Sequence, residues 1–187
     1  MRILAILLLI LLGARPAAAS EEAAWTALRS DGHIALMRHT DAPGVADPPG
    51  FRLDDCTTQR NLSAKGRADA VAVGARLKAQ GARLGRIVSS PWCRCIDTAT
   101  LMDVGRIETE PTFSNAVVLS DRRTELAQGA RDIMRAWKGP GTLLAVTHGA
   151  NIQALTGYNP AAGEIVVVAT QADGTLREIG RLPVPQR

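Results

Sequence analysis

The stretch TLLAVTHG, residues 142–149, sets the fold class of this chain. Its first six residues are apolar or β-prone and predict a buried strand. His148 and Gly149 follow at once, and a short helix that ends at Gly157 comes next. Open α/β sheets bind their ligands beyond the carboxyl ends of their strands, so His148 stands where such a sheet would use it.

Two earlier stretches show the same arrangement. Residues 33–37 (HIALM) predict a short strand that runs into Arg38 and His39. Residues 86–89 (RIVS) predict a second strand, which ends just before a predicted helix with Arg94 in its first turn. Two strands of this chain are therefore expected to end in Arg or His side chains, and a third to lead into a helix that carries Arg94.

The rest of the chain supplies the other layers of the fold. Local patterns predict helices over 20–30, 63–80, 91–102 and 121–137, a short strand over 107–110, and a hairpin over 164–170 and 175–179. Strands that alternate with helices predict an α/β fold, a three-layer sandwich with a mostly parallel central sheet flanked by helices. No internal repeat or second domain is evident, so residues 20–187 are expected to form a single domain.

Arg38, His39, Arg94 and His148 are expected to meet at one edge of the sheet. Guanidinium groups offer forked donors that match phosphate oxygens, and they keep their charge. A histidine among cations favours its neutral form, which leaves a ring nitrogen free to attack phosphorus. The second histidine can donate to the phosphoryl oxygens as charge develops on them. The pattern predicts a phosphate site.

The motifs around these residues stand in a recognisable order. They are Arg38-His39, Asn61-Leu62-Ser63-x-x-Gly66-Arg67, Ser89-Ser90-Pro91-x-x-Arg94 and Thr147-His148-Gly149. Over about residues 33–155 the chain resembles the histidine phosphatase superfamily, also called phosphoglycerate mutase-like. The resemblance implies a phosphoglycerate mutase-like fold, a phosphohistidine formed on His39, and no metal or organic cofactor.

The resemblance also assigns the pocket. Arg38, Arg94 and His148 are expected to bind the phosphoryl group, and further substrate contacts are expected from Thr40, Arg60, Asn61, Ser90 and Gly149. Thr40 departs from the family, which usually has Gly at that position, and it either adds a donor or tightens the turn. For Arg60 and Asn61 the alternative is a solvated loop that caps the next helix.

A carboxylic acid that protonates the leaving group is commonly found in the family between the second Arg and the last strand. The candidates here are Asp121 and Glu125. We prefer Asp121 because it lies where a loop is expected to meet a helix, although a helix N-cap would explain it as well. Glu125 is expected to be a solvated helix residue.

The three cysteines are too few for a disulfide-built scaffold. Cys93 and Cys95 are separated by one residue, an awkward spacing for a bridge within one helix. We predict that Cys56 is bridged to one of them, which would attach the long polar loop to the second motif. The alternative is three reduced thiols.

Residues 1–19 have the layout of a secretory signal peptide: Arg2, an apolar run, then Ala17-Ala18-Ala19. The run from Ile3 to Leu12 is about half of the 20 residues that a membrane span needs, so a stable anchor is not expected. The segment holds two of the 22 basic residues and no acidic one, so its removal lowers the net charge from +4 to +2. This weak basicity, without basic runs interleaved with aromatics, argues against nucleic acid as a partner.

Together these features predict an exported enzyme, periplasmic or secreted, that hydrolyses small phosphate monoesters through His39, with sugar phosphates as candidate substrates. The rival hypothesis is a module that binds a phosphorylated ligand without turning it over.

Overall fold

The computed structural model describes residues 20–186, and the leader predicted over residues 1–19 lies outside them. In this part of the chain one six-stranded sheet has the order β3-β2-β4-β1-β5-β6. The strands are β1 (Ile34–Arg38), β2 (Leu84–Ser89), β3 (Ile107–Thr109), β4 (Thr142–Thr147), β5 (Ile165–Thr170) and β6 (Leu176–Leu182).

The centre of the sheet is parallel. β4 lies between β1 and β2 and pairs in parallel with both, whereas β5 and β6 form the predicted antiparallel hairpin at one side. Arg38 is opposite Thr147 and Ser89 is opposite Val146, so the three strands end at the same level. The predicted α/β class with a mostly parallel sheet is confirmed.

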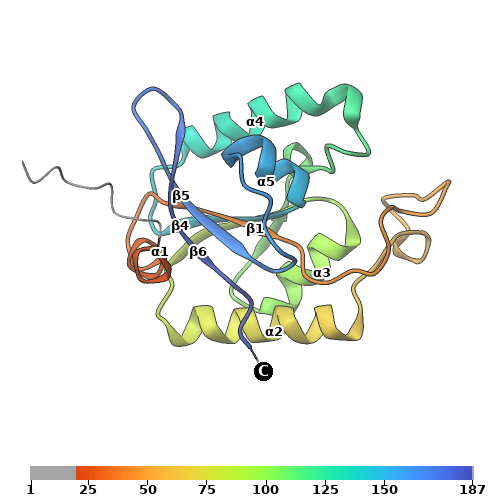
Figure 1. Ribbon diagram of the computed structural model, residues 1–187, viewed down its shortest axis with the longest axis horizontal. Helices are drawn as coiled ribbons and strands as arrows, with labels where there is room; N and C mark the ends of the chain where they lie inside the picture. Colours follow the sequence, from red (N-terminus) through yellow and green to blue (C-terminus); the bar gives the residue numbers. More distant parts are fainter. Residues whose placement is uncertain (1–19, 187) are drawn as a thin grey trace, which may run out of the picture.

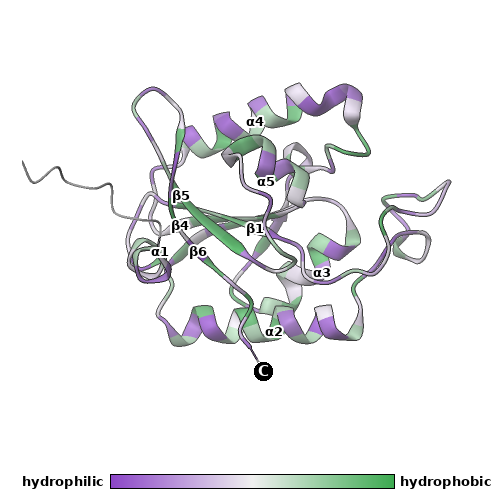
Figure 2. Ribbon diagram, viewed as in Figure 1, coloured by the Kyte–Doolittle hydropathy of each residue, from purple (hydrophilic) through white to green (hydrophobic). Residues whose placement is uncertain are grey.

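Helices cover both faces of the sheet (Figure 1). They are α1 (Glu21–Leu28), α2 (Ala64–Ala79), α3 (Cys93–Met102), α4 (Arg123–Ala136) and α5 (Gly149–Thr156). Ala35 and Met37 of β1 pack with α1, α2 and α3, whereas Ile34 and Leu36 pack with α4 and α5. Successive side chains of a strand point to opposite faces, which is why β1 serves two separate cores. Figure 2 shows the apolar sheet between helices whose outer faces are hydrophilic.

The start of α2 is fixed against the end of β1. The Ser63 hydroxyl accepts a hydrogen bond from the Gly66 N–H at 2.9 Å, which caps the helix. Gly66 lies against the backbone of Asp41, where any Cβ would collide with the Asp41 carbonyl oxygen. This close approach holds the chain just after β1 beside the helix.

The long segment between β1 and α2 contains the three-residue 3-10 helix η1 (Cys56–Thr58) and otherwise lacks regular structure. A disulfide joins Cys56 to Cys93, at the first residue of α3, which confirms the predicted bridge and leaves Cys95 as a buried thiol. The same stretch is held by Gln59, whose side-chain oxygen accepts from the Cys93 N–H at 3.0 Å. The loop is therefore attached to the part of α3 that carries Arg94. Among the described residues, no helix combines the length and the apolar character that crossing a membrane requires.

Candidate active site

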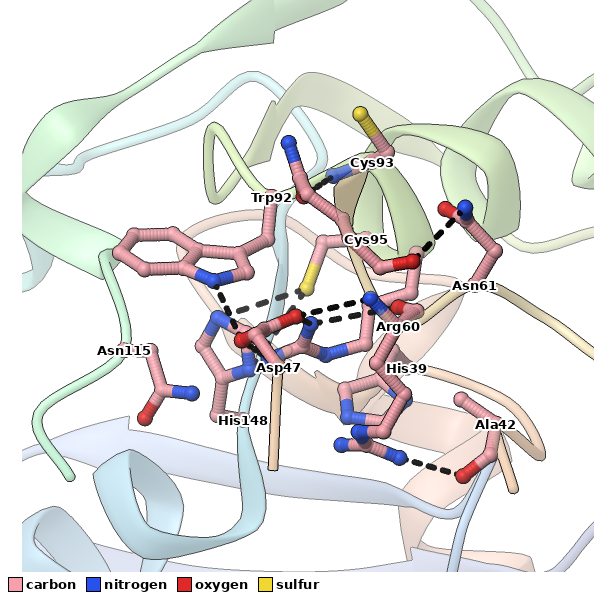
Figure 3. Close-up of polar contacts among 12 residues, drawn as sticks. His39, Ala42, Asp47, Arg60, Asn61, Trp92, Cys93, Cys95, Asn115 and His148 are labelled. Carbon is pink, nitrogen blue, oxygen red and sulfur yellow. Dashed lines mark hydrogen bonds and ion pairs between the residues drawn. The ribbon is translucent and has the colours of Figure 1, made fainter. Parts of the chain in front are cut away.

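Arg38, His39, Arg94 and His148 come together at the carboxyl edge of the parallel strands, as predicted from their positions. Arg38 ends β1, His148 follows β4, and Arg94 lies in the first turn of α3. They line a cavity of about 270 Å³ together with Val45, Ala46, Asp47, Arg60, Asn115, Val117, Val118, Gly149, Ala150 and Asn159. Figure 3 shows His39, Asp47, Arg60 and His148 around this cavity.

His39 is held in one tautomer. Its Nδ1 lies 2.8 Å from the Thr40 carbonyl oxygen, which can only accept, so Nδ1 carries the proton and Nε2 keeps a free lone pair. Burial is the main cause that lowers the pKa of His39 to about 3; the charges of Arg94, Arg60 and Arg38 act in the same direction, and the hydrogen bond to Thr40 opposes them. His39 is therefore a neutral imidazole at physiological pH, with Nε2 available as a nucleophile.

His148 is buried beside His39, with the two ring centroids 5.5 Å apart. Its Nε2 is 2.9 Å from the Ser90 hydroxyl, and the ring meets Trp92 edge to face. The Cys95 thiol lies 3.7 Å from the same nitrogen (Figure 3). Burial above all, together with the charges of Arg94, Arg60 and Arg38, holds the pKa of His148 well below its ordinary value. The ring is neutral and fixed by its neighbours.

Three arginines give the cavity its positive character. Arg38 donates from Nη1 to the Pro160 carbonyl at 2.9 Å, and Arg60 donates from Nη1 to the Ala42 carbonyl. In Arg38, Arg60 and Arg94 the Nε–H group is buried and has no hydrogen-bond partner. Buried donors are rarely left unsatisfied, so three of them around one cavity indicate a site built for an anion.

Asp47 is a functional residue that the sequence analysis missed. Its carboxylate accepts from Nη1 of Arg94 at 2.8 Å, from Nε1 of Trp92 at 3.1 Å and from the Arg60 N–H at 3.0 Å (Figure 3). Burial pushes the pKa of Asp47 up, but the hydrogen bonds from Arg94 and Arg60 and the Arg94 charge outweigh it, so the net pKa lies below its ordinary value. Asp47 is ionised while it holds Arg94.

Two of the predicted substrate contacts line the cavity, namely Arg60 and Gly149. A Cβ at Gly149 would lie 2.7 Å from the Asn159 side-chain oxygen and 3.4 Å from Nε of Arg38. Glycine at this position therefore leaves room for the Asn159 side chain at the cavity.

The other three predicted contacts take supporting positions. Buried Thr40 donates its N–H to the Thr98 hydroxyl at 3.2 Å, and Ser90 supports His148. Asn61 donates its amide to the Cys56 and Gln59 carbonyls. These side chains shape the site from behind and do not line the cavity.

The structure does not bring Asp121 or Glu125 to the cavity. Asp121 is exposed in the 3-10 helix η3 (Ser120–Arg122), and exposed Glu125 is paired with Arg122 at 2.6 Å. The preference for Asp121 is corrected on this ground, because the carboxylate that lines the cavity belongs to Asp47. In the described residues, no group of three or more His, Cys, Asp or Glu side chains is placed to hold a metal ion.

Comparison with known families finds one similarity. Residues 34–115 match the model of the histidine phosphatase superfamily, branch 1. Over this region the chain is similar to the histidine phosphatase superfamily. The matched region includes Arg38, His39, Arg60 and Arg94, and His148 lines the same cavity from beyond its end. No curated protein matches the chain.

Solved structures share the histidine phosphatase fold. The protein histidine phosphatase SixA, complexed with tungstate, is 19% identical at a TM-score of 0.53, covering 80% of this chain and 96% of its own. The mycobacterial glucosyl-3-phosphoglycerate phosphatase is 17% identical at a TM-score of 0.56, and the match covers 80% of this chain and 95% of that protein. The phosphoserine phosphatase of Entamoeba histolytica is 14% identical at a TM-score of 0.55, and the match covers 80% of this chain and 95% of that protein. At these identities the likeness establishes the fold.

Proposed function

We propose that this protein is a phosphomonoesterase that works through a phosphohistidine on His39. The observation that carries the proposal is the neutral His39, with Nε2 free, among three arginines whose buried Nε–H groups lack partners. A phosphoryl group placed there would meet a nucleophile and cationic donors at once. The three structural neighbours named above are phosphatases, which agrees with this reaction class.

In the first step Nε2 of His39 attacks phosphorus, and the bond from phosphorus to the ester oxygen breaks. Its electron pair goes to the ester oxygen, which leaves as an alcohol once it takes a proton. Arg38, Arg60 and Arg94 stabilise the charge on the phosphoryl oxygens, with His148 beside them. In the second step water attacks the phosphohistidine, phosphate leaves, and His39 regains its lone pair.

Asp47 is the carboxyl group placed to supply the proton. Substrate phosphate must share or take the Arg94 donors that now hold the Asp47 carboxylate. Loss of that contact, together with a dianion nearby, raises the pKa of Asp47 and favours its protonated form. Asp47 can then protonate the leaving oxygen and afterwards accept a proton from the attacking water.

Hydrolysis of p-nitrophenyl phosphate by the purified protein tests the proposal. We expect release of p-nitrophenol and phosphate, with competitive inhibition by inorganic phosphate. A protein that bound phosphate but released no p-nitrophenol would instead be the rival binding module.

We also propose that the protein works outside the cytoplasm. Support comes from the leader-like residues 1–19 and from the disulfide between Cys56 and Cys93, because disulfides persist in oxidising compartments. N-terminal sequencing of the protein isolated from its native host tests this: we expect it to begin near Ser20, and a start at Met1 would contradict export with cleavage.

A further inference from the structure

The mouth of the cavity is apolar, although its floor is cationic. Among residues 20–186 the large hydrophobic side chains left exposed are Val45, Leu53, Val71, Val117 and Val118. Three of the five, Val45, Val117 and Val118, line this one cavity, with exposed fractions of 101%, 61% and 40%. Scattered exposed valines need no explanation, but a group at one cavity mouth marks a surface that meets a ligand.

The two segments that carry these valines are each fixed to the site. Val45 lies two residues before Asp47, which is bonded to Arg94 and Trp92. Val117 donates its N–H to the Asn115 side chain at 3.0 Å, and the neighbouring Ala116 N–H donates to Asn151 of α5 at 3.1 Å. Residues next to the valines therefore anchor both segments beside the phosphate floor.

Few polar groups remain at this mouth to bind hydroxyls. The Asn115 side-chain oxygen accepts from Val117, which leaves its NH2 group as a donor, and the Asp47 carboxylate accepts from Arg94, Trp92 and Arg60. Exposed Asn159 is the further amide among the lining residues. A sugar carries a hydroxyl on nearly every carbon, and valine side chains leave such hydroxyls without partners.

We propose that the preferred substrates are phosphate monoesters of alcohols with an apolar chain next to the phosphate, and that Val45, Val117 and Val118 determine this specificity. The inference rests on the proposed function, because it places the phosphoryl group among the arginines and the leaving alcohol at the valines. The inference argues against the sugar phosphates that the sequence analysis gave as candidate substrates.

Binding of non-hydrolysable phosphonates tests the inference apart from catalysis. Isothermal titration would compare methyl-, butyl- and hexylphosphonate with glucose 6-phosphate on the His39→Ala protein, which cannot turn over the sugar ester. A fully buried methylene strengthens binding about fourfold, so a half-exposed one gives roughly twofold. We therefore expect hexylphosphonate to bind roughly tenfold or more tightly than methylphosphonate, and glucose 6-phosphate to bind no better than methylphosphonate.

The matched variants replace valine by the isosteric threonine. The triple variant Val45→Thr, Val117→Thr, Val118→Thr should bring the ratio of hexyl- to methylphosphonate affinity close to one. Val71→Thr, at an exposed valine of α2 outside the cavity, should keep the wild-type ratio. Equal affinities for all chain lengths, or tightest binding of glucose 6-phosphate, would overturn the inference.

Hydrolysis by the wild-type protein separates the two proposals. Affinity that rises with chain length without release of phosphate from hexyl phosphate would sink the proposed function and keep the specificity. Hydrolysis of hexyl phosphate and glucose 6-phosphate at equal kcat/KM would support the proposed function and overturn the specificity. Phosphate release from phosphatidate in vesicles supports a lipid source of the substrate, and release from dissolved hexyl phosphate alone supports a soluble one.

Discussion

The carboxylate of Asp47 lies 2.8 Å from Nη1 of Arg94, with side-chain exposures of only 2% and 1%. An internal carboxylate therefore holds a guanidinium that we propose binds phosphate. A buried ion pair of this kind adds little net stability, but removal of one partner leaves the other charge uncompensated. The pair keeps Arg94 oriented towards the cavity, and the incoming phosphoryl group has to compete with Asp47 for it.

His39→Ala should abolish catalysis while the fold persists, because Nε2 of His39 is the proposed nucleophile. We expect kcat for p-nitrophenyl phosphate to fall by a factor on the order of 10³ or more. Radiolabelled phosphate trapped on the wild-type protein as an acid-labile adduct should be absent from the variant. His33→Ala, at a half-buried histidine that contacts Ser30 away from the cavity, is the control and should keep the label. A label that persisted in His39→Ala would move the nucleophile elsewhere.

The free energy of unfolding should decrease as the pH falls below about 6.5. Burial holds the pKa of His39 at about 3, below its ordinary value of 6.5, so between these pH values the unfolded chain binds a proton that the folded protein does not. The stabilisation is fully present above pH 6.5 and is lost towards pH 3, at about 1.4 kcal/mol per pH unit. Urea unfolding between pH 4.5 and 7.5 measures the slope.

His39→Gln should make that slope shallower by about the same amount per pH unit, leaving the contribution of His148, whose pKa is lowered in the same direction. Equal slopes in wild type and variant would show that His39 is protonated in the folded protein. The lowered pKa of His39 also affects activity, since a neutral His39 remains a nucleophile throughout the mildly acidic range.

The sequence was sufficient to predict which Arg and His side chains lie at the ends of the parallel strands. Arg38, His39 and His148 follow buried strands, and the carboxyl ends of parallel strands necessarily share an edge of the sheet. Arg94 follows from a helix that starts directly after such a strand. These residues could be predicted together because regular structure fixes their positions without knowledge of any loop.

Asp47 and Asp121 show that the positions of residues in loops could not be predicted in the same way. Asp47 lies in an irregular loop, whose path depends on tertiary contacts with Trp92 and Arg94 and on a disulfide, and none of these leaves a periodic pattern. Asp121 stands at the right place in chain order, but the order does not tell which way η3 faces. Ser90 and Asn61 belong to recognisable motifs, yet their side chains point to His148 and to the loop backbone.

Asp47→Asn should separate substrates by the quality of their leaving group. Loss of the proposed proton donor should lower kcat for alkyl phosphates by a factor on the order of 10², whereas p-nitrophenolate leaves without protonation and its kcat should change little. Inorganic phosphate should bind more tightly, because a negative charge no longer competes for Arg94. Asp54→Asn, at an exposed aspartate of the same loop, is the control and should leave both substrates unaffected. Equal loss for both classes of substrate would contradict a role in leaving-group protonation.

The bridge between Cys56 and Cys93 should stabilise both the protein and its site. It spans a sequence separation of 37 residues, for which loop-closure entropy predicts about 3–4 kcal/mol. It also ties the loop that carries Asp47 and Arg60 to the start of α3, so its loss should raise KM more than it lowers kcat. Unfolding curves and kinetics of the double variant Cys56→Ser, Cys93→Ser measure both effects.

Reductant provides the matched comparison for this bridge. Dithiothreitol should lower the stability of the wild-type protein towards that of the double variant and should leave the double variant itself unchanged. Buried Cys95 remains a thiol in both proteins, so alkylation after unfolding without reductant should label one cysteine in each. Three labelled cysteines in the unreduced wild-type protein would show that the bridge is absent, and the loop would then depend on the contacts of Asp47 and Gln59 alone.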